Sequence, residues 1–129
     1  MISYRQNFNG SKSRGYCKLT EILETALDSE ADSVTLEYAD GGLEVCFMFG
    51  NVGGGGVLVD RELEEEVVGC IVSQARLENK PRGKMKMQLR GVDHTIVVRE
   101  YDSFGESAFE LKIGEMASKS RKAKRKTRT

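Results

Sequence analysis

The sequence predicts an α+β domain in which an antiparallel sheet of about five strands is covered on one face by two helices. Two stretches show the apolar spacing of amphipathic helices, and several short stretches alternate apolar and polar residues as half-buried strands do. Turn sequences rich in glycine separate these strands and favour hairpins, which imply antiparallel pairing. The predicted order is helix, two strands, an optional short strand, helix and three strands.

The first half of the chain supplies one helix and one hairpin. Five apolar residues between Leu19 and Leu27 recur at spacings of three and four, which predicts a helix of about three turns. Residues 34–38 and 43–49 alternate apolar and polar side chains and are predicted to pair across a turn at Asp40-Gly41. The glycine run 53–56 interrupts this pattern, so only a short strand or a lead-in is expected after it.

The second half supplies another helix and a meander. Asp60 is placed to cap this helix, and the glutamates that follow lie where the helix dipole favours negative charge. Pro81 cannot continue a helix and marks its end. Three strands are then expected, at residues 84–90, 96–98 and 109–113.

Length and composition indicate one cytoplasmic domain. The chain has 129 residues, of which 39% are hydrophobic and 31% charged, as in ordinary globular proteins. We expect an N-terminal arm at residues 1–16, the domain at residues 17–114 and a basic tail at residues 115–129. No apolar run approaches the roughly 20 residues needed to cross a bilayer, and the first 15 residues lack the apolar stretch of a signal peptide.

The reactive residue types predict no catalytic, metal or cofactor site. Cys17, Cys46 and Cys70 are odd in number and far apart, which favours free thiols over a disulfide framework or a zinc site. His94 is the only histidine, so no histidine-based metal cluster can form within one chain. The glycine run lacks the lysine and hydroxyl residue of a phosphate loop. The chain is therefore expected not to be an enzyme.

The net charge of zero conceals a division between the body and the tail. Seven of the 20 basic residues and none of the 20 acids lie in residues 119–129, which leaves the body at 13 − 20 = −7. Such a tail suits phosphate contacts with nucleic acid, an anionic membrane or an acidic protein, although solubility alone would also explain it. The tail cations are Lys119, Arg121, Lys122, Lys124, Arg125, Lys126 and Arg128.

A second basic feature lies on the predicted meander. Lys84, Lys86 and Arg90 are expected on one face of a strand, opposite an apolar face, and they define a candidate basic surface. The alternative is the ordinary outer face of a one-sided sheet. The full candidate set is Arg82, Lys84, Lys86, Arg90 and Arg99.

Four segments in the same order resemble one family. The segments LTEILETALDSEADSVTLEY (19–38), LEVCFMFGNV (43–52), ENKPRGKMKMQLRG (78–91) and VVREYDSFGESAFELKI (97–113) are similar to the domain that precedes the core of type II secretion and type IV pilus assembly ATPases. Several positions depart from that family: Thr35 stands in place of its histidine, and Cys46 and Met48 in place of arginines. The Gly-x-x-x-x-Gly-Lys-Ser/Thr pattern of the ATPase core is missing from this sequence.

The resemblance implies a PAS-like fold and a protein-binding role. On this interpretation the chain docks on a protein partner, such as a secretion or pilus ATPase or another assembly component. The resemblance also implies that basic residues from the general region of the candidate basic set, Arg82 to Arg99, come near a nucleotide that a neighbouring core domain holds. The alternative from another class is a nucleic-acid-associated protein that acts through its basic tail. A PAS-like small-molecule sensor is disfavoured because no polar cluster lies among the predicted core residues.

Overall fold

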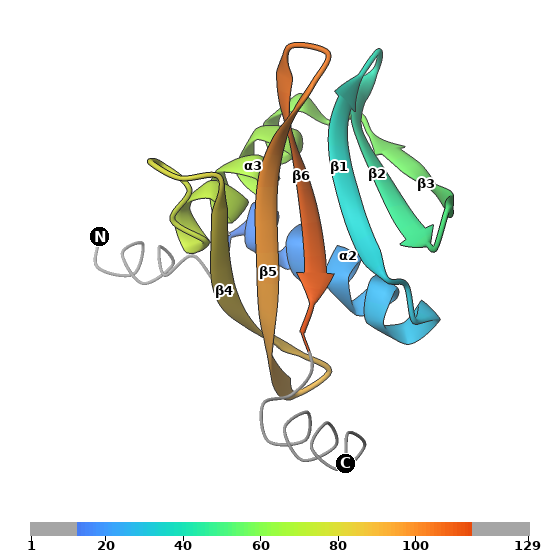
Figure 1. The fold of residues 1–129 in the computed structure, drawn as a ribbon, viewed down its shortest axis with the longest axis vertical. Helices are drawn as coiled ribbons and strands as arrows, with labels where there is room; N and C mark the ends of the chain where they lie inside the picture. The colour runs from blue at the N-terminus through green and yellow to red at the C-terminus, as the bar shows by residue number, and fades with distance from the viewer. Residues whose placement is uncertain (1–12, 115–129) are drawn as a thin grey trace, which may run out of the picture.

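A computed structural model of the chain describes residues 13–114, so most of the predicted arm and the whole basic tail lie outside the described residues. The described elements alternate as one helix and three strands, twice (Figure 1). They are α2 (Arg14–Ser29), β1 (Ser33–Ala39), β2 (Gly42–Phe49), β3 (Val52–Leu58), α3 (Arg61–Gln74), β4 (Arg82–Leu89), β5 (Val92–Ser103) and β6 (Glu106–Ile113).

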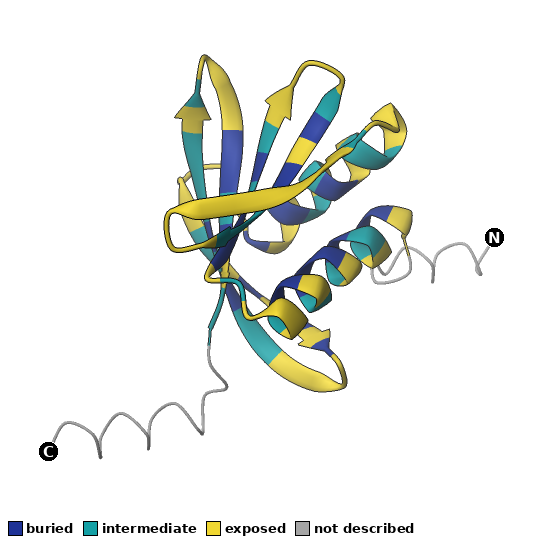
Figure 2. Ribbon diagram, turned by 90° about the vertical axis from the view of Figure 1, so that its right-hand side faces the viewer, coloured by how far each residue is buried: buried dark blue, intermediate teal, exposed yellow. Residues whose placement is uncertain are grey.

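The strands form one antiparallel sheet in the order β3-β2-β1-β6-β5-β4. The predicted α+β class and element order are confirmed, and the pairing of β1 with β6 joins the two halves. Both helices lie on the same side of the sheet (Figure 2). The opposite side, which we call the open face, is covered by no helix within residues 13–114 (Figure 1).

The described sheet has six strands rather than about five, because the glycine run belongs to a full strand. β3 pairs with β2 over its whole length, from Val52 opposite Phe49 to Leu58 opposite Leu43. An edge strand needs backbone hydrogen bonds to only one neighbour, so it can form without the alternating side chains that identify buried strands. The optional third strand of the prediction is therefore real. It begins at Val52 and includes the glycine run, whereas the prediction placed it after that run.

Helix α2 begins at Arg14, earlier than its apolar stripe predicted. The Ser13 hydroxyl accepts a hydrogen bond from the Tyr16 amide at 3.0 Å and caps the first turn. The amide of Gly15 donates to a Glu66 carboxylate oxygen of α3 at 3.0 Å. A side chain at position 15 would overlap the backbone of Glu66, so glycine allows the close approach of the two helices.

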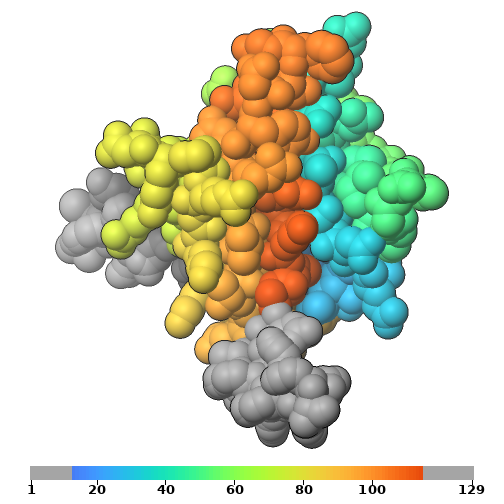
Figure 3. Space-filling model, viewed as in Figure 1, coloured from blue at the N-terminus to red at the C-terminus, as the bar shows by residue number. Residues whose placement is uncertain are grey.

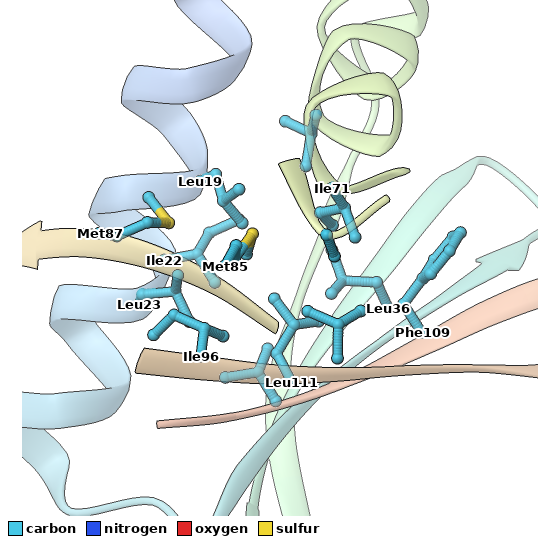
Figure 4. Close-up of a cluster of buried hydrophobic side chains, with 14 of the residues drawn as sticks. Leu19, Ile22, Leu23, Leu36, Ile71, Met85, Met87, Ile96, Phe109 and Leu111 are labelled. Atoms are coloured by element: carbon cyan, nitrogen blue, oxygen red, sulfur yellow. The ribbon is translucent and has the colours of Figure 1, made fainter. Parts of the chain in front are cut away.

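The core lies between the helices and the sheet (Figure 4). Leu19 and Leu23 of α2 and Ile71 of α3 are fully buried there. The strands contribute the alternate residues that sequence periodicity predicted, including Leu36 of β1 and Leu111 of β6. Burial of these apolar side chains is the main stabilising term of the fold.

Candidate partner-binding surfaces

A basic hollow of about 470 Å³ lies at the β4 edge of the sheet. Its floor is formed by small or apolar residues of β4, β5 and the C-cap of α3, and its rim carries four cations. Figure 3 shows the open face, with the chain around β4 at its left edge. We define the basic hollow by its floor of Ala75, Gly83 and Val97 and its rim of Arg76, Lys80, Arg82 and Lys84.

A sharp reversal after α3 brings these cations together. Arg76 adopts a left-handed backbone conformation with φ 54°, and its amide donates to the Ser73 carbonyl oxygen at 3.3 Å. Leu77 is buried and holds the returning chain against the core. The Pro81 carbonyl then accepts a hydrogen bond from the Glu100 amide at 2.7 Å, which attaches the start of β4 to β5. The rim therefore has a fixed scaffold.

The open face extends this positive charge beyond the hollow. Lys84 of β4 and Lys112 of β6 both lie opposite Val97 of β5, and Lys86 follows Lys84 on the same face. Within residues 13–114, the four rim cations, Lys86 and Lys112 form no ion pair, whereas Arg14, Lys18, Arg90 and Arg99 do. An acidic body thus carries a local cluster of uncompensated cations, which favours an anionic partner at this surface.

Arg90 does not share the predicted basic surface. It lies in the turn between β4 and β5 with φ 52°, because β4 ends at Leu89. Its guanidinium forms ion pairs with α2, at 2.5 Å to Asp28 and 3.5 Å to Glu24. The hydrogen bond from Arg90 lowers the pKa of the Asp28 carboxyl below its usual value. Arg90 therefore ties the turn to α2 on the helix side of the sheet.

Arg99 lies on the open face but is already paired. Its Nε donates to Glu110 Oε1 at 3.1 Å, and the guanidinium lies over the Tyr101 ring at 4.9 Å from the centroid. Within the described residues, only Arg82, Lys84 and Lys86 of the predicted set thus remain as unpaired cations on that face. Sequence reasoning missed Arg76, Lys80 and Lys112, because their proximity depends on the turn after α3 and on the pairing of β5 with β6.

A half-buried polar network occupies the centre of the open face. Tyr101 donates its hydroxyl hydrogen bond to a Glu37 carboxylate oxygen at 2.5 Å, and Ser103 Oγ lies 3.4 Å from the other oxygen. Ala108, opposite Tyr101 in the sheet, is fully buried on this face. Burial, together with the neighbouring Glu37 carboxylate, raises the pKa of Tyr101 well above its usual value.

Replacing Tyr101 by Phe is expected to lower the free energy of unfolding by about 1 kcal/mol at pH 8, because Glu37 loses a hydrogen-bond donor. The folded pKa of Tyr101 lies above the unfolded value of about 10. Its contribution is therefore fully present below about pH 10 and declines as the pH rises toward the folded pKa. Urea titrations at pH 8 and pH 11 should show a smaller difference between wild type and Tyr101→Phe at pH 11. An equal difference would contradict the assigned hydrogen bond.

Other reactive residues form no recognisable site in the described part of the chain. Residues 13–114 contain no group of three or more histidine, cysteine, aspartate or glutamate residues that could hold a metal ion. The Cys70 thiol is partly buried, and burial raises its pKa to about 11. A membrane-crossing helix, long and apolar enough to span a bilayer, is likewise not found among residues 13–114.

Comparison with models of known protein families and with curated proteins finds no match to this sequence. The fold and the surfaces themselves define the chain as an α+β domain with an open sheet face and a basic hollow at one sheet edge. Its function is inferred from the geometry of residues 13–114 and from the sequence resemblance.

Proposed function

We propose that this chain is a non-enzymatic protein-binding module that docks an acidic segment of a protein partner in the basic hollow. The observation that carries this proposal is the rim of four cations, without ion pairs in the described part of the chain, around an apolar floor. Carboxylates of a partner would compensate the rim charges, and apolar side chains between them would cover the partly exposed Val97. Charge complementarity of this kind mainly increases association rate and specificity.

The apolar floor favours a polypeptide over a nucleic acid. A single-stranded nucleic acid is held by cations that follow its backbone and by aromatic side chains on which its bases stack. Among residues 13–114, the aromatic residue in the centre of the open face is Tyr101. Its hydroxyl group donates to Glu37, and the Arg99 guanidinium group lies over its ring. Exposed Glu44 and partly buried Glu110 also lie on this face, where they would repel a continuous run of phosphates.

The sequence resemblance supports a more specific form of the proposal. Residues 18–113 resemble the PAS-like domain that precedes the core of secretion and pilus assembly ATPases. The chain would then act in the cytoplasm as a relative of that domain, with such an ATPase or another assembly component as its partner. The missing phosphate loop is consistent with binding rather than ATP hydrolysis.

The proposal is tested by titrating the full chain with a fluorescent peptide in which glutamate and leucine alternate. Reversing two rim charges, Arg82→Glu with Lys84→Glu, should weaken binding tenfold or more, about 1.4 kcal/mol. The control is a charge reversal outside the hollow, Arg61→Glu, which is compared with the single rim reversal Arg82→Glu so that net charge changes equally. Equal loss of affinity in both variants would contradict a specific role for the basic hollow.

The second candidate function is nucleic-acid association, favoured by seven cations in residues 119–129. Six or seven phosphate contacts would give a log–log dependence of affinity on salt with a slope of roughly −4 to −6. Titration of a labelled oligonucleotide at two salt concentrations, with intact protein and with residues 119–129 deleted, measures this slope. We expect negligible binding at about 0.15 M salt; tight binding that is lost on deletion would instead establish the second function.

A further inference from the structure

The two edges of the sheet differ sharply in chemistry. The edge strand β4 carries Arg82, Lys84 and Lys86, whereas the edge strand β3 has no charged residue among Val52–Leu58. Figure 2 shows β3 in front, exposed along nearly its whole length. Natural sheets commonly place charged side chains, proline or a covering element on an edge to prevent pairing with another chain. Within the described residues, β3 has none of these.

The backbone of β3 offers hydrogen-bonding groups toward solvent. In an antiparallel pair, alternate residues direct both their N–H and C=O groups to the neighbouring strand, and the residues between them direct these groups away. Phe49 and Val52 close the two-residue hairpin and pair with each other. Gly53, Gly55 and Val57 therefore direct their backbone groups to the free edge, where a further strand could pair.

An apolar groove of about 260 Å³ runs beside this edge, between α2 and strands β2 and β3. Ile22, Phe47 and Leu58 contribute its apolar side chains. Its rim carries Lys18 and Glu21, which pair with each other at 3.4 Å and leave the rim without net charge. Exposed apolar side chains of β3 lie beside the groove, since Val52 and Val57 are 69% and 49% exposed.

We propose that a second copy of this chain occupies the β3 edge and the groove beside it. The two β3 strands pair antiparallel about a two-fold axis at Gly55, the midpoint of Val52–Leu58. This register places Val52 of one copy opposite Leu58 of the other, and Gly54 opposite Gly56. It matches inward-directed residues with inward-directed residues, as a continuous sheet requires.

The chemistry of both edges favours a second copy and limits assembly to two. A two-fold axis brings the same edge of two copies together. Because β3 has no charged residue, its pairing with a second β3 brings no like charges together. The remaining edge of each copy is β4, where Arg82, Lys84 and Lys86 would meet the same cations of another copy and repel them. The dimer therefore has closed symmetry. It leaves the basic hollow, at the opposite edge, accessible in both copies.

The size of a stable interface sets a further requirement. A specific interface buries at least about 600 Å² on each partner. Because seven residues of an edge strand form only a narrow strip, the groove walls must also be covered. The glycines at positions 54 and 56 face the groove with open space above them, so the walls of two grooves can approach across the axis. Exposed side chains of α2 that line the groove, such as Glu21 and Thr25, therefore belong to the proposed interface.

The test is sedimentation equilibrium of the full chain near 100 µM, where we expect a mass of twice 14.4 kDa. Gly54→Glu and Gly56→Lys should each weaken self-association at least tenfold, because each places a charge inside the interface. A β-carbon at either position meets no atom within 4 Å, so both variants should fold. Mixing the two variants should restore dimers, since the introduced carboxylate of one chain then lies opposite the introduced ammonium group of the other.

The matched control is Gly69→Glu, which adds the same charge at an exposed glycine of α3 with equally open surroundings. It should leave the dimer unchanged, and thermal unfolding of every variant verifies that it is folded. A monomeric wild-type chain at 100 µM would overturn the proposal. Dimers that persist in both β3 variants, or variants that do not recombine on mixing, would overturn the proposed interface and its register.

Discussion

Replacing Phe109 by Ala is expected to lower the free energy of unfolding by about 3–5 kcal/mol. Phe109 is 1% exposed and is the largest fully buried side chain among residues 13–114. It lies in β6 opposite Leu36 of β1 and Glu100 of β5, at the junction that joins the two halves of the sheet. Its removal would leave a cavity where three central strands and the helices meet, and urea unfolding followed by circular dichroism measures the loss.

The matched control is Phe104→Ala, the same substitution at the tip of the β5–β6 hairpin. Phe104 is fully exposed, so its replacement should change the free energy of unfolding by no more than about 0.5 kcal/mol. Domains of this kind are stable by only about 5–15 kcal/mol, so Phe109→Ala removes a large share of the total. Similar losses of unfolding free energy in the two variants would contradict the placement of Phe109 in the centre of the core.

Periodic side chains explain why much of this fold is predictable from sequence. The apolar stripe from Leu19 to Leu27 and the alternation in residues 34–38 reflect burial on one face. The structure places most of these apolar residues in the core, whereas Tyr38, at the end of β1, is 37% exposed. The glycines of β3 carry no such pattern, so their strand depends on backbone pairing with β2 that sequence cannot display. Phe47 shows a similar limit. The alternation in residues 43–49 predicts that Phe47 is buried on the inner face of its strand, but the side chain is only partly buried and lines the groove beside α2.

The candidate surfaces were predictable only where they lie within one strand. Arg82, Lys84 and Lys86 follow one another along β4, and their alternation places them on one face. Arg90 continues that alternation in sequence, but β4 ends at Leu89. The turn that follows directs the Arg90 side chain toward Asp28 of α2. Arg76 and Lys80 join the rim through a left-handed turn, and Lys112 joins the open face through β6. Contacts between elements of this kind have no signature in local sequence.

Gly83 connects the stability of the fold with the geometry of the basic hollow. It lies in the hollow floor, where β4 passes the end of α3. A β-carbon at position 83 would overlap the carbonyl oxygen of Ala75 and meet its side chain at 3.3 Å. Because Ala75 is itself buried, neither partner can move without displacing the core. Only glycine therefore permits this approach.

Replacing Gly83 by Ala is expected to lower the free energy of unfolding by about 1–3 kcal/mol, as overpacking does. The same displacement should separate Arg82 and Lys84 from Arg76 and Lys80, and so weaken binding of the glutamate–leucine peptide. The control is Gly69→Ala, at an exposed helical position with open surroundings, which should raise the free energy of unfolding by about 0.5–1 kcal/mol. If α3 and β4 meet as described, urea unfolding should show a lower free energy of unfolding for Gly83→Ala and a higher one for Gly69→Ala. Peptide titration should show weaker binding for Gly83→Ala alone. A stabilised Gly83→Ala variant that still binds the peptide at wild-type affinity would contradict this contact and its role in shaping the hollow.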